Sequence, residues 1–230
     1  AGALAGYLDA GTFITGGVLD RYARQRPTRA YGFFAASGVY FFRFLRLAAL
    51  ATPVYGWLFT YVHPWLFAER LADLTRDIAV ERTVMLWRGS FYALFGALLV
   101  LVNIVFDYAK VRIVVEDRRS AVGALGAAVR FVRRAPARVL GLYALNSLAF
   151  LAVIGAWSLL APGAGSTGLS VWLAFAAGQV YVLARLLLKL HFLASETALF
   201  QRSLAHAAYT AAPVPAWPES PAAETIAAKR

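Results

Sequence analysis

The stretch VLGLYALNSLAFLAVIGAWSLLAPGAGSTGLSVWLAFAAGQVYVLA, residues 139–184, contains no Asp, Glu, Lys or Arg. A Pro/Gly-rich turn at residues 161–168 divides it into two apolar halves. Crossing the hydrocarbon core of a bilayer takes about 20 apolar residues in an α-helix, and each half has that length. The stretch therefore predicts a membrane hairpin, with spans at residues 139–160 and 169–191.

Further apolar stretches extend this pattern along the chain. Residues 38–62 and 89–109 predict two more complete spans, and residues 1–19 predict a partial span whose start lies upstream. Four prolines among alanines predict a Pro/Ala-rich cytoplasmic tail over residues 201–230. The expected fold class is all-α, a polytopic transmembrane helix bundle over residues 1–200 with two interfacial amphipathic helices.

Each interfacial helix is predicted from one apolar stripe and one start signal. Pro64 suits the first turn of a helix on the outer face, and Ser120 suits the N-cap of a helix on the inner face. The outer stripe comprises Phe67, Leu71, Leu74, Ile78 and Met85, and the inner stripe comprises Val122, Leu125, Val129 and Val132. Such stripes predict helices that lie along the membrane surface.

Composition supports a membrane protein and excludes some chemistry. The chain is 60% hydrophobic and 15% charged, whereas ordinary soluble domains carry roughly 25% charged residues. It has no Cys, which excludes disulfides, thiolate metal sites and iron–sulfur ligation. A net charge of +11 would suggest nucleic acid in a soluble protein, but these arginines flank apolar spans, so anionic lipid headgroups are the expected partner rather than nucleic acid.

The distribution of Lys and Arg predicts an orientation. Residues 20–30 hold four Arg and residues 110–138 hold eight Lys or Arg, whereas the turn at 161–168 holds none. Cytoplasmic loops carry the excess of basic residues, so the basic loops and the tail are expected inside. Abundant Ala and the preference for Arg over Lys are typical of a GC-rich bacterial genome. We therefore expect a multi-pass protein of the bacterial inner membrane.

Ionisable and amide side chains within spans are the first functional candidates, because they are costly in lipid. Asn103, Asp107 and Lys110 share one face of their span, and Arg185 and Lys189 share one face of the last span with Glu196. Asp107 is expected to pair with Arg185 or Lys189. The predicted helix–helix polar contacts are Asn103, Asp107, Lys110, Asn146, Gln179, Arg185 and Lys189. The pair formed by Asp107 either fixes packing or serves as a relay for ions or protons, and Asn146 and Gln179 are expected to hydrogen-bond across helices.

Basic residues around the inner amphipathic helix form a second candidate surface. Arg119, Arg130, Arg133 and Arg134 flank its apolar stripe. Each basic residue near an anionic leaflet gains about 1 kcal/mol, which explains the rim by lipid attraction alone. An acidic partner protein or a specific headgroup is the alternative. The sequence therefore predicts a lipid or partner surface here.

No catalytic, cofactor or metal motif is apparent. His63 lies among aromatic residues typical of the membrane interface, and no His-x-x-x-His or Gly-x-Ser-x-Gly occurs. Glu69, Asp73, Asp77 and Glu81 recur every four residues along the outer helix, but Arg70, Arg76 and Arg82 lie between them. Local neutralisation explains this acidic ridge, and a divalent-cation site is the alternative. No cofactor is therefore expected.

One segment carries a family resemblance. Phe106-Asp-Tyr-Ala-Lys-Val-Arg112, the following amphipathic helix and Arg133-Arg-Ala-Pro136 together resemble uncharacterised bacterial multi-span membrane proteins. Their layout is similar to the membrane domain attached to some glycerophosphodiester phosphodiesterases. The resemblance implies no catalytic residue, because the phosphodiesterase chemistry resides in a separate soluble domain.

Three functions are consistent with these features. The first is a non-enzymatic accessory or scaffold subunit of a larger membrane complex, which packs against other subunits through small-residue faces at residues 2–6 and 174–178. The second is a component of a transporter for small solutes or lipids, which requires Asp9, Asn103, Asp107, Asn146 and Gln179 to converge. The third is an intramembrane lipid enzyme that uses the acidic ridge to hold a metal.

Overall fold

The computed structural model describes residues 2–25, 29–161 and 168–211. Within these ranges all regular secondary structure is helical, and no strand occurs. The helices are α1 (Gly2–Arg24), α2 (Ala30–Trp57), α3 (Leu71–Thr75), α4 (Glu81–Val115), α5 (Ala121–Arg134), α6 (Pro136–Leu160) and α7 (Leu169–Ala211), with two π-helical turns, η1 (Leu58–Val62) and η2 (Trp65–Arg70), before α3. The predicted all-α class is confirmed.

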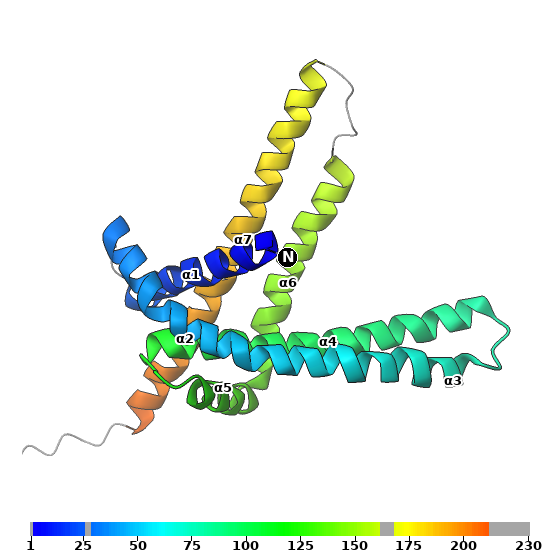
Figure 1. Cartoon of the computed structure of the whole chain (residues 1–230), viewed down its shortest axis with the longest axis horizontal. Helices are drawn as coiled ribbons and strands as arrows, with labels where there is room; N and C mark the ends of the chain where they lie inside the picture. The colour runs from blue at the N-terminus through cyan, green and yellow to red at the C-terminus, as the bar shows by residue number, and fades with distance from the viewer. Residues whose placement is uncertain (1, 26–28, 162–167, 212–230) are drawn as a thin grey trace, which may run out of the picture.

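The helices form a central hub from which two hairpins project (Figure 1). The hub consists of α1, the first half of α2, the second half of α4, α5 and the last part of α7. Its core contains Leu19, Tyr40, Phe44, Ile104, Tyr108, Val111 and Phe200, all nearly inaccessible to solvent. In the hub α1 packs so closely on α2 that a Cβ added at Gly17 would lie 2.5 Å from the Oγ atom of Ser37. The close approach of the two helices therefore requires glycine at this contact.

The first hairpin, here called the α3–α4 arm, comprises residues 58–99. It pairs η1, η2 and α3 with the first half of α4, and it extends sideways from the hub in Figure 1. Leu58, Leu66 and Phe95 form a small core of its own. Stacked rings extend this core, with the centroids of His63 and Phe67 separated by 4.6 Å.

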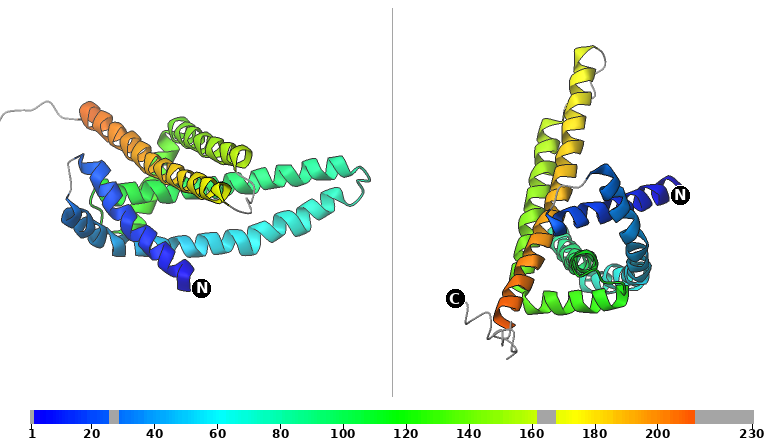
Figure 2. Two further views of the ribbon diagram at one scale, coloured as in Figure 1. Left: turned by 90° about the horizontal axis from the view of Figure 1, so that it is seen from above. Right: turned by 90° about the vertical axis from the view of Figure 1, so that its left-hand side faces the viewer.

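The second hairpin, here called the α6–α7 arm, comprises residues 140–161 and 168–195. It projects in a different direction from the α3–α4 arm, as Figure 1 and the right view in Figure 2 show. Asn146 is the only buried residue in these ranges. Large apolar side chains along both helices, including Leu148, Leu159, Trp172, Phe175 and Leu183, are exposed. The surroundings of this arm must therefore be apolar.

Four helical segments are long and apolar enough to cross a membrane, as the sequence predicted. They are Ala30–Thr75, Glu81–Val115, Pro136–Leu160 and Leu169–Leu204. All except Pro136–Leu160 extend well beyond the predicted spans. The charged residues that suggested span ends are good helix formers, so the helices continue through them. The chain is thus an α-helical membrane protein by length and composition of its helices.

The outer interfacial helix expected to begin at Pro64 is not formed. The helix that begins at Ala30 continues past Pro64 to Thr75, and the chain turns only at residues 76–80. The π-helical turns on both sides of Pro64 accommodate a residue that lacks a backbone N–H. The predicted stripe from Phe67 to Met85 is consequently divided between two antiparallel helices, and the acidic ridge is divided with it.

The inner amphipathic helix is confirmed as α5, but its buried face coincides only in part with the predicted stripe, since Val132 is buried and Leu125 packs against the core. The Oγ atom of Ser120 accepts a hydrogen bond from the backbone N–H of Gly123 at 3.1 Å, as expected for an N-cap. Ala124 and Ala128 pack into the hub, whereas Val122 and Val129 are exposed. Small side chains let α5 approach its neighbours closely, so alanine occupies the buried face.

The C-terminal tail was predicted to begin too early. Helix α7 continues to Ala211, because no proline occurs between residues 201 and 212 and the segment is rich in Ala. The prolines of the predicted tail lie at residues 212–230, outside the described residues.

Candidate functional site

Polar side chains from α2, α4, α6 and α7 lie where the two arms join the hub; some are hydrogen-bonded in pairs and the others interact through their charges. We call this set the junction cluster; its members are Tyr55, Asn103, Asp107, Tyr108, Lys110, Tyr143, Asn146, Ser195 and Glu196. Burial of a polar group among apolar helices costs free energy unless the group is hydrogen-bonded or paired. The contacts of each member therefore indicate its role.

Three of the predicted residues lie on one side of the cluster. The hydroxyl of Tyr55 on α2 donates a short hydrogen bond to Oδ1 of Asn103 on α4. One turn along α4, Nζ of Lys110 donates to Oδ1 of Asp107 at 2.8 Å. The cluster thus joins α2 to α4 through a neutral pair and keeps an ion pair within α4.

Asn146 joins the helices of the α6–α7 arm. Its Nδ2 atom donates to Oγ of Ser195 at 2.8 Å, and that hydroxyl donates to the carbonyl oxygen of Phe192 at 3.0 Å. Asn146 is only 2% exposed. The predicted role of Asn146 as a polar contact between helices is therefore observed, with a partner that the sequence did not identify.

Glu196 is the member that sequence analysis undervalued. It is 2% exposed, and it forms no hydrogen bond or ion pair with any residue that the structure describes. The charged side chains that interact with Glu196 are Asp107 and Lys110. The carboxyl group also interacts with the hydroxyl of Tyr108, which likewise lacks a described hydrogen-bond partner. The helix face shared by Arg185, Lys189 and Glu196 was the available signal, but its position near the predicted end of a span suggested exposure.

The remaining predicted contact residues lie outside the cluster. Gln179, Arg185 and Lys189 are exposed on α7. The guanidinium of Arg185 stacks on the rings of Phe150 and Tyr181, 5.8 and 5.6 Å from their centroids. Asp107 was expected to pair with Arg185 or Lys189; it pairs instead with Lys110, which lies one turn away on its own helix.

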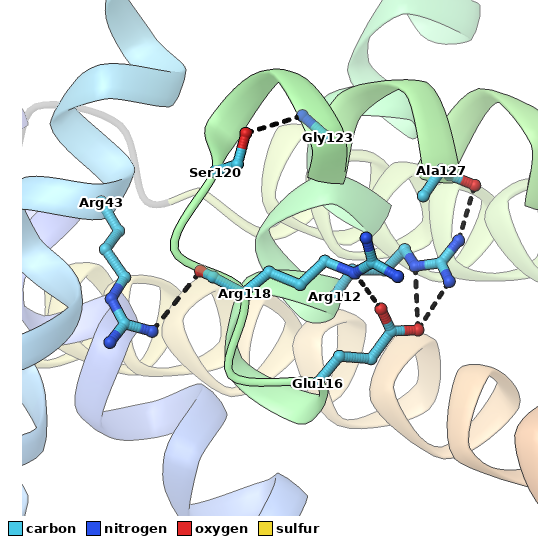
Figure 3. Close-up of polar contacts among 7 residues, drawn as sticks. All are labelled: Arg43, Arg112, Glu116, Arg118, Ser120, Gly123 and Ala127. Carbon is cyan, nitrogen blue, oxygen red and sulfur yellow. Dashed lines mark hydrogen bonds and ion pairs between the residues drawn. The ribbon is translucent and has the colours of Figure 1, made fainter.

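A second polar group, here called the arginine network, surrounds the turn between α4 and α5 (Figure 3). Arg112 on α4 donates to Oε1 of Glu116 from Nη2 at 2.6 Å and from Nε at 3.1 Å, and from Nη1 to the carbonyl oxygen of Ala127 on α5 at 2.6 Å. Arg118 donates to Oε2 of the same glutamate. These bonds fix α5 against α4.

Helix α2 is tied to the same turn. Nη1 of Arg43 lies 2.5 Å from Oδ1 of Asp117 and 3.4 Å from the carbonyl oxygen of Arg118. Asp117 adopts the left-handed conformation, with φ of 47°, and the N–H of Arg118 bonds to the carbonyl of Ile113 at 3.0 Å. This is the usual end of an α-helix, and it directs Asp117 toward α2.

The network alters the acidity of its two carboxyl groups. Partial burial acts to raise the pKa of Glu116, but hydrogen bonds from Arg112 and Arg118 outweigh it and hold that pKa below its usual value. The hydrogen bond from Arg43 lowers the pKa of Asp117. Both carboxylates thus stay ionised at neutral pH, and the network acts as a structural clamp.

The predicted basic rim consists of exposed arginines without described ion pairs. Arg119, Arg130, Arg133 and Arg134 are exposed, and none of them forms an ion pair within the part of the chain that the structure describes. They lie around α5, on the side of the hub that carries the arginine network. Their guanidinium groups are available to anions such as lipid phosphates.

Metal binding has no assembled site in the described ranges. No three His, Asp or Glu side chains there are grouped so that they could hold an ion. The acidic ridge is interrupted by the turn at residues 76–80, and Asp73 pairs with Arg76 at 3.2 Å. His63 stacks between the rings of Phe59 and Phe67. The four acids of the ridge were expected along one face of a single helix, and this prediction is wrong.

Comparison with known proteins adds no family to this description. No protein-family model, no curated protein and no solved structure matches the chain.

Proposed function

We propose that the chain is a non-enzymatic accessory or scaffold subunit of a larger complex in the bacterial inner membrane. The observation that carries the proposal is the α6–α7 arm, in which no residue from 169 to 195 is buried. The hub holds the base of this arm. Beyond the base, the two helices of the arm contact only each other within the described chain. Such an arm suits the recruitment of another membrane protein.

Small residues on α7 support a protein partner. Ala174 and Gly178 lie one turn apart, and a Cβ added at Gly178 would meet no atom within 4 Å. Small residues at this spacing let a second helix approach closely in a membrane, where tight packing replaces the hydrophobic effect as the driving force. The corresponding face at residues 2–6 lies largely outside the residues whose side chains are described.

The charge distribution supports the proposed orientation. The arginine network and the free arginines around α5 lie at the hub, whereas the turn between α6 and α7 contains no charged residue. With the hub at the cytoplasmic side, Arg119, Arg130, Arg133 and Arg134 contact anionic headgroups, and the tail is cytoplasmic. Nucleic acid is not a partner in this arrangement.

Purification from the native membrane tests the scaffold function. The protein is extracted in mild detergent, and the polypeptides that migrate with it are identified by mass spectrometry. Stoichiometric co-migration of another membrane protein is expected. It should be lost in Gly178→Leu and kept in Ala176→Leu, which places the same side chain on another face of α7. Recovery of the chain alone or as a homo-oligomer would contradict the proposal.

A transport component is the second candidate, and convergence of polar groups favours it. Asn103, Asp107 and Asn146 all belong to the junction cluster, where they bond to Tyr55, Lys110 and Ser195 respectively, and a transport path requires polar groups gathered in this way. Gln179 and Asp9 are exposed and do not join them. Reconstituted vesicles that contain a pH-sensitive dye would show proton flux under this function, and Asp107→Asn would abolish it. Vesicles as tight as protein-free ones would contradict it.

A further inference from the structure

The charges of the junction cluster do not balance. Asp107 and Glu196 are two acids, and Lys110 is the single base that interacts with both. Lys110 is already bound to Asp107, so one carboxylate would remain without a counter-charge if every group were ionised. An uncompensated charge among apolar helices costs several kcal/mol, and proteins avoid it by neutralising the group.

Among the described residues, Lys110 is the cation whose charge acts on Glu196. Helix α6 contributes the hydroxyl of Tyr143, whereas Tyr55 of α2 interacts with Asp107 and Lys110 instead. On α4, the next base is Arg112, which is held by Glu116 and stacks on the ring of Phe200 with 5.1 Å to its centroid. On α1, Arg21 lines a cavity of about 350 Å³ with Thr197 and Ala198, which lie on a different face of α7 from Glu196. Neutrality therefore needs one positive charge from outside the chain.

We propose that the junction cluster is a proton-binding site and that the carboxyl group of Glu196 carries one exchangeable proton at neutral pH. Binding transfers H⁺ from a hydronium ion to one carboxylate oxygen of Glu196: one O–H bond forms, one O–H bond of hydronium breaks, and water is left. Release is the reverse, in which a water molecule takes up the proton. Lys110 and Asp107 remain paired in this state. The site is independent of the scaffold function and requires no partner subunit.

A proton fits this position better than a metal cation. An ion bound at Glu196, which is buried, would be repelled by the positive charge of Lys110, which already acts on this carboxyl group. A carboxylic acid needs no additional room and brings no net charge. The neighbouring hydroxyl of Tyr108, which lacks a described partner, offers polar surroundings to a neutral carboxyl group.

Loss of the proton would change the packing at the base of the α6–α7 arm. Ionised Glu196 would compete with Asp107 for Lys110. Its neighbour Ser195 binds Asn146 of α6, so movement of this turn of α7 toward α4 would strain the contact between α6 and α7. Proton exchange is therefore coupled to the docking of α7 on the hub.

Infrared spectroscopy of the full chain in vesicles at pH 7 tests the site directly, because a protonated carboxyl group has its own C=O band. The wild type is expected to show this band, Glu196→Gln to lose it, and Glu69→Gln, which alters an exposed acid, to retain it. Absence of the band from the wild type, or its persistence in Glu196→Gln, would overturn the proposal.

A second variant keeps the test decisive if Glu196→Gln does not fold. Lys110→Met removes the only base of the cluster, so both acids must be protonated to reach neutrality and the band should grow about two-fold. An unchanged band would overturn the charge balance on which the proposal depends. Replacement of choline chloride by sodium chloride should leave the wild-type band unchanged; loss of the band with sodium would overturn the assignment to a proton.

Discussion

The two arms differ in how much of their apolar surface they bury between their own helices. Each is a helical hairpin with many exposed apolar side chains, but the α3–α4 arm buries Leu58, Leu66, Leu71 and Phe95 between its helices. In the α6–α7 arm Asn146 alone is buried among the residues described, and ring stacking of Trp157 on Tyr181, with centroids 4.6 Å apart, joins the helices farther out. One hairpin has its own core, and the other depends on what surrounds it.

The difference shows that similar hydropathy does not imply similar internal packing. The α3–α4 arm uses phenylalanines on both helices, which fill the space between them. In the α6–α7 arm, Ala174 and Gly178 are half-buried on the face of α7 that carries Tyr181, and a Cβ added at Gly178 would meet no atom within 4 Å. A hairpin with its own core acts as a rigid element, whereas one without a core is suited to assembly with a partner.

The largest loss of stability is expected from a substitution in the core of the α3–α4 arm. Phe95 is 6% exposed, so Phe95→Ala should destabilise the protein by about 4 kcal/mol. Unfolding by SDS in mixed micelles, followed by circular dichroism, measures the change. Phe175 on the other arm is 60% exposed, and Phe175→Ala should cost less than about 0.5 kcal/mol. Equal losses would refute the contrast between the arms.

The next effect concerns the hub that supports both arms. Arg112→Gln removes the bonds to Glu116 and to the carbonyl of Ala127, and it leaves the half-buried carboxylate of Glu116 paired with Arg118 alone. A loss of about 2 kcal/mol is expected in the same unfolding assay, as for the removal of charge-assisted hydrogen bonds. The exposed Arg134 serves as the control, with Arg134→Gln expected within about 0.5 kcal/mol of wild type. If the two variants were equally stable, the network would not be a clamp.

Acid should weaken the hub through the same residues. The pKa values of Glu116 and Asp117 are lowered in the folded state, so their contribution is present above the ordinary carboxyl range and is lost as the pH falls through the folded-state values. Stability measured from pH 7 down to pH 3 should therefore decline. The decline should be shallower in Glu116→Gln. An identical slope in wild type and variant would contradict this assignment.

The smallest effect sharpens the description of the α6–α7 arm. Asn146→Leu removes the hydrogen bond to Ser195, and polar contacts between membrane helices contribute about 0.6 kcal/mol on average. Gln179→Leu, at an exposed position, should change stability by less than that. A double-mutant cycle of Asn146 and Ser195 isolates the bond. Zero coupling would show that the bond does not hold the arm together.

Sequence reasoning located the elements whose signals are local. The charge-free stretch with a Pro/Gly turn predicted the α6–α7 hairpin, and Ser120 marked the start of α5. It failed where distant contacts decide the outcome. Pro64 looked like a helix start because the π-helical turns that accommodate it have no sequence signature. The burial of Glu196 depends on how α7 packs against α4, which periodicity within α7 cannot reveal.

Photo-cross-linking in the native membrane tests the central claim most directly, namely that the α6–α7 arm is completed by another polypeptide. A photoreactive residue is placed at position 174, at position 176 on another face of α7, or at the exposed Tyr61 of the α3–α4 arm. The proposed scaffold function predicts a protein adduct of one discrete mass from position 174 and none from the other two. Adducts with lipid alone from all three positions would contradict it.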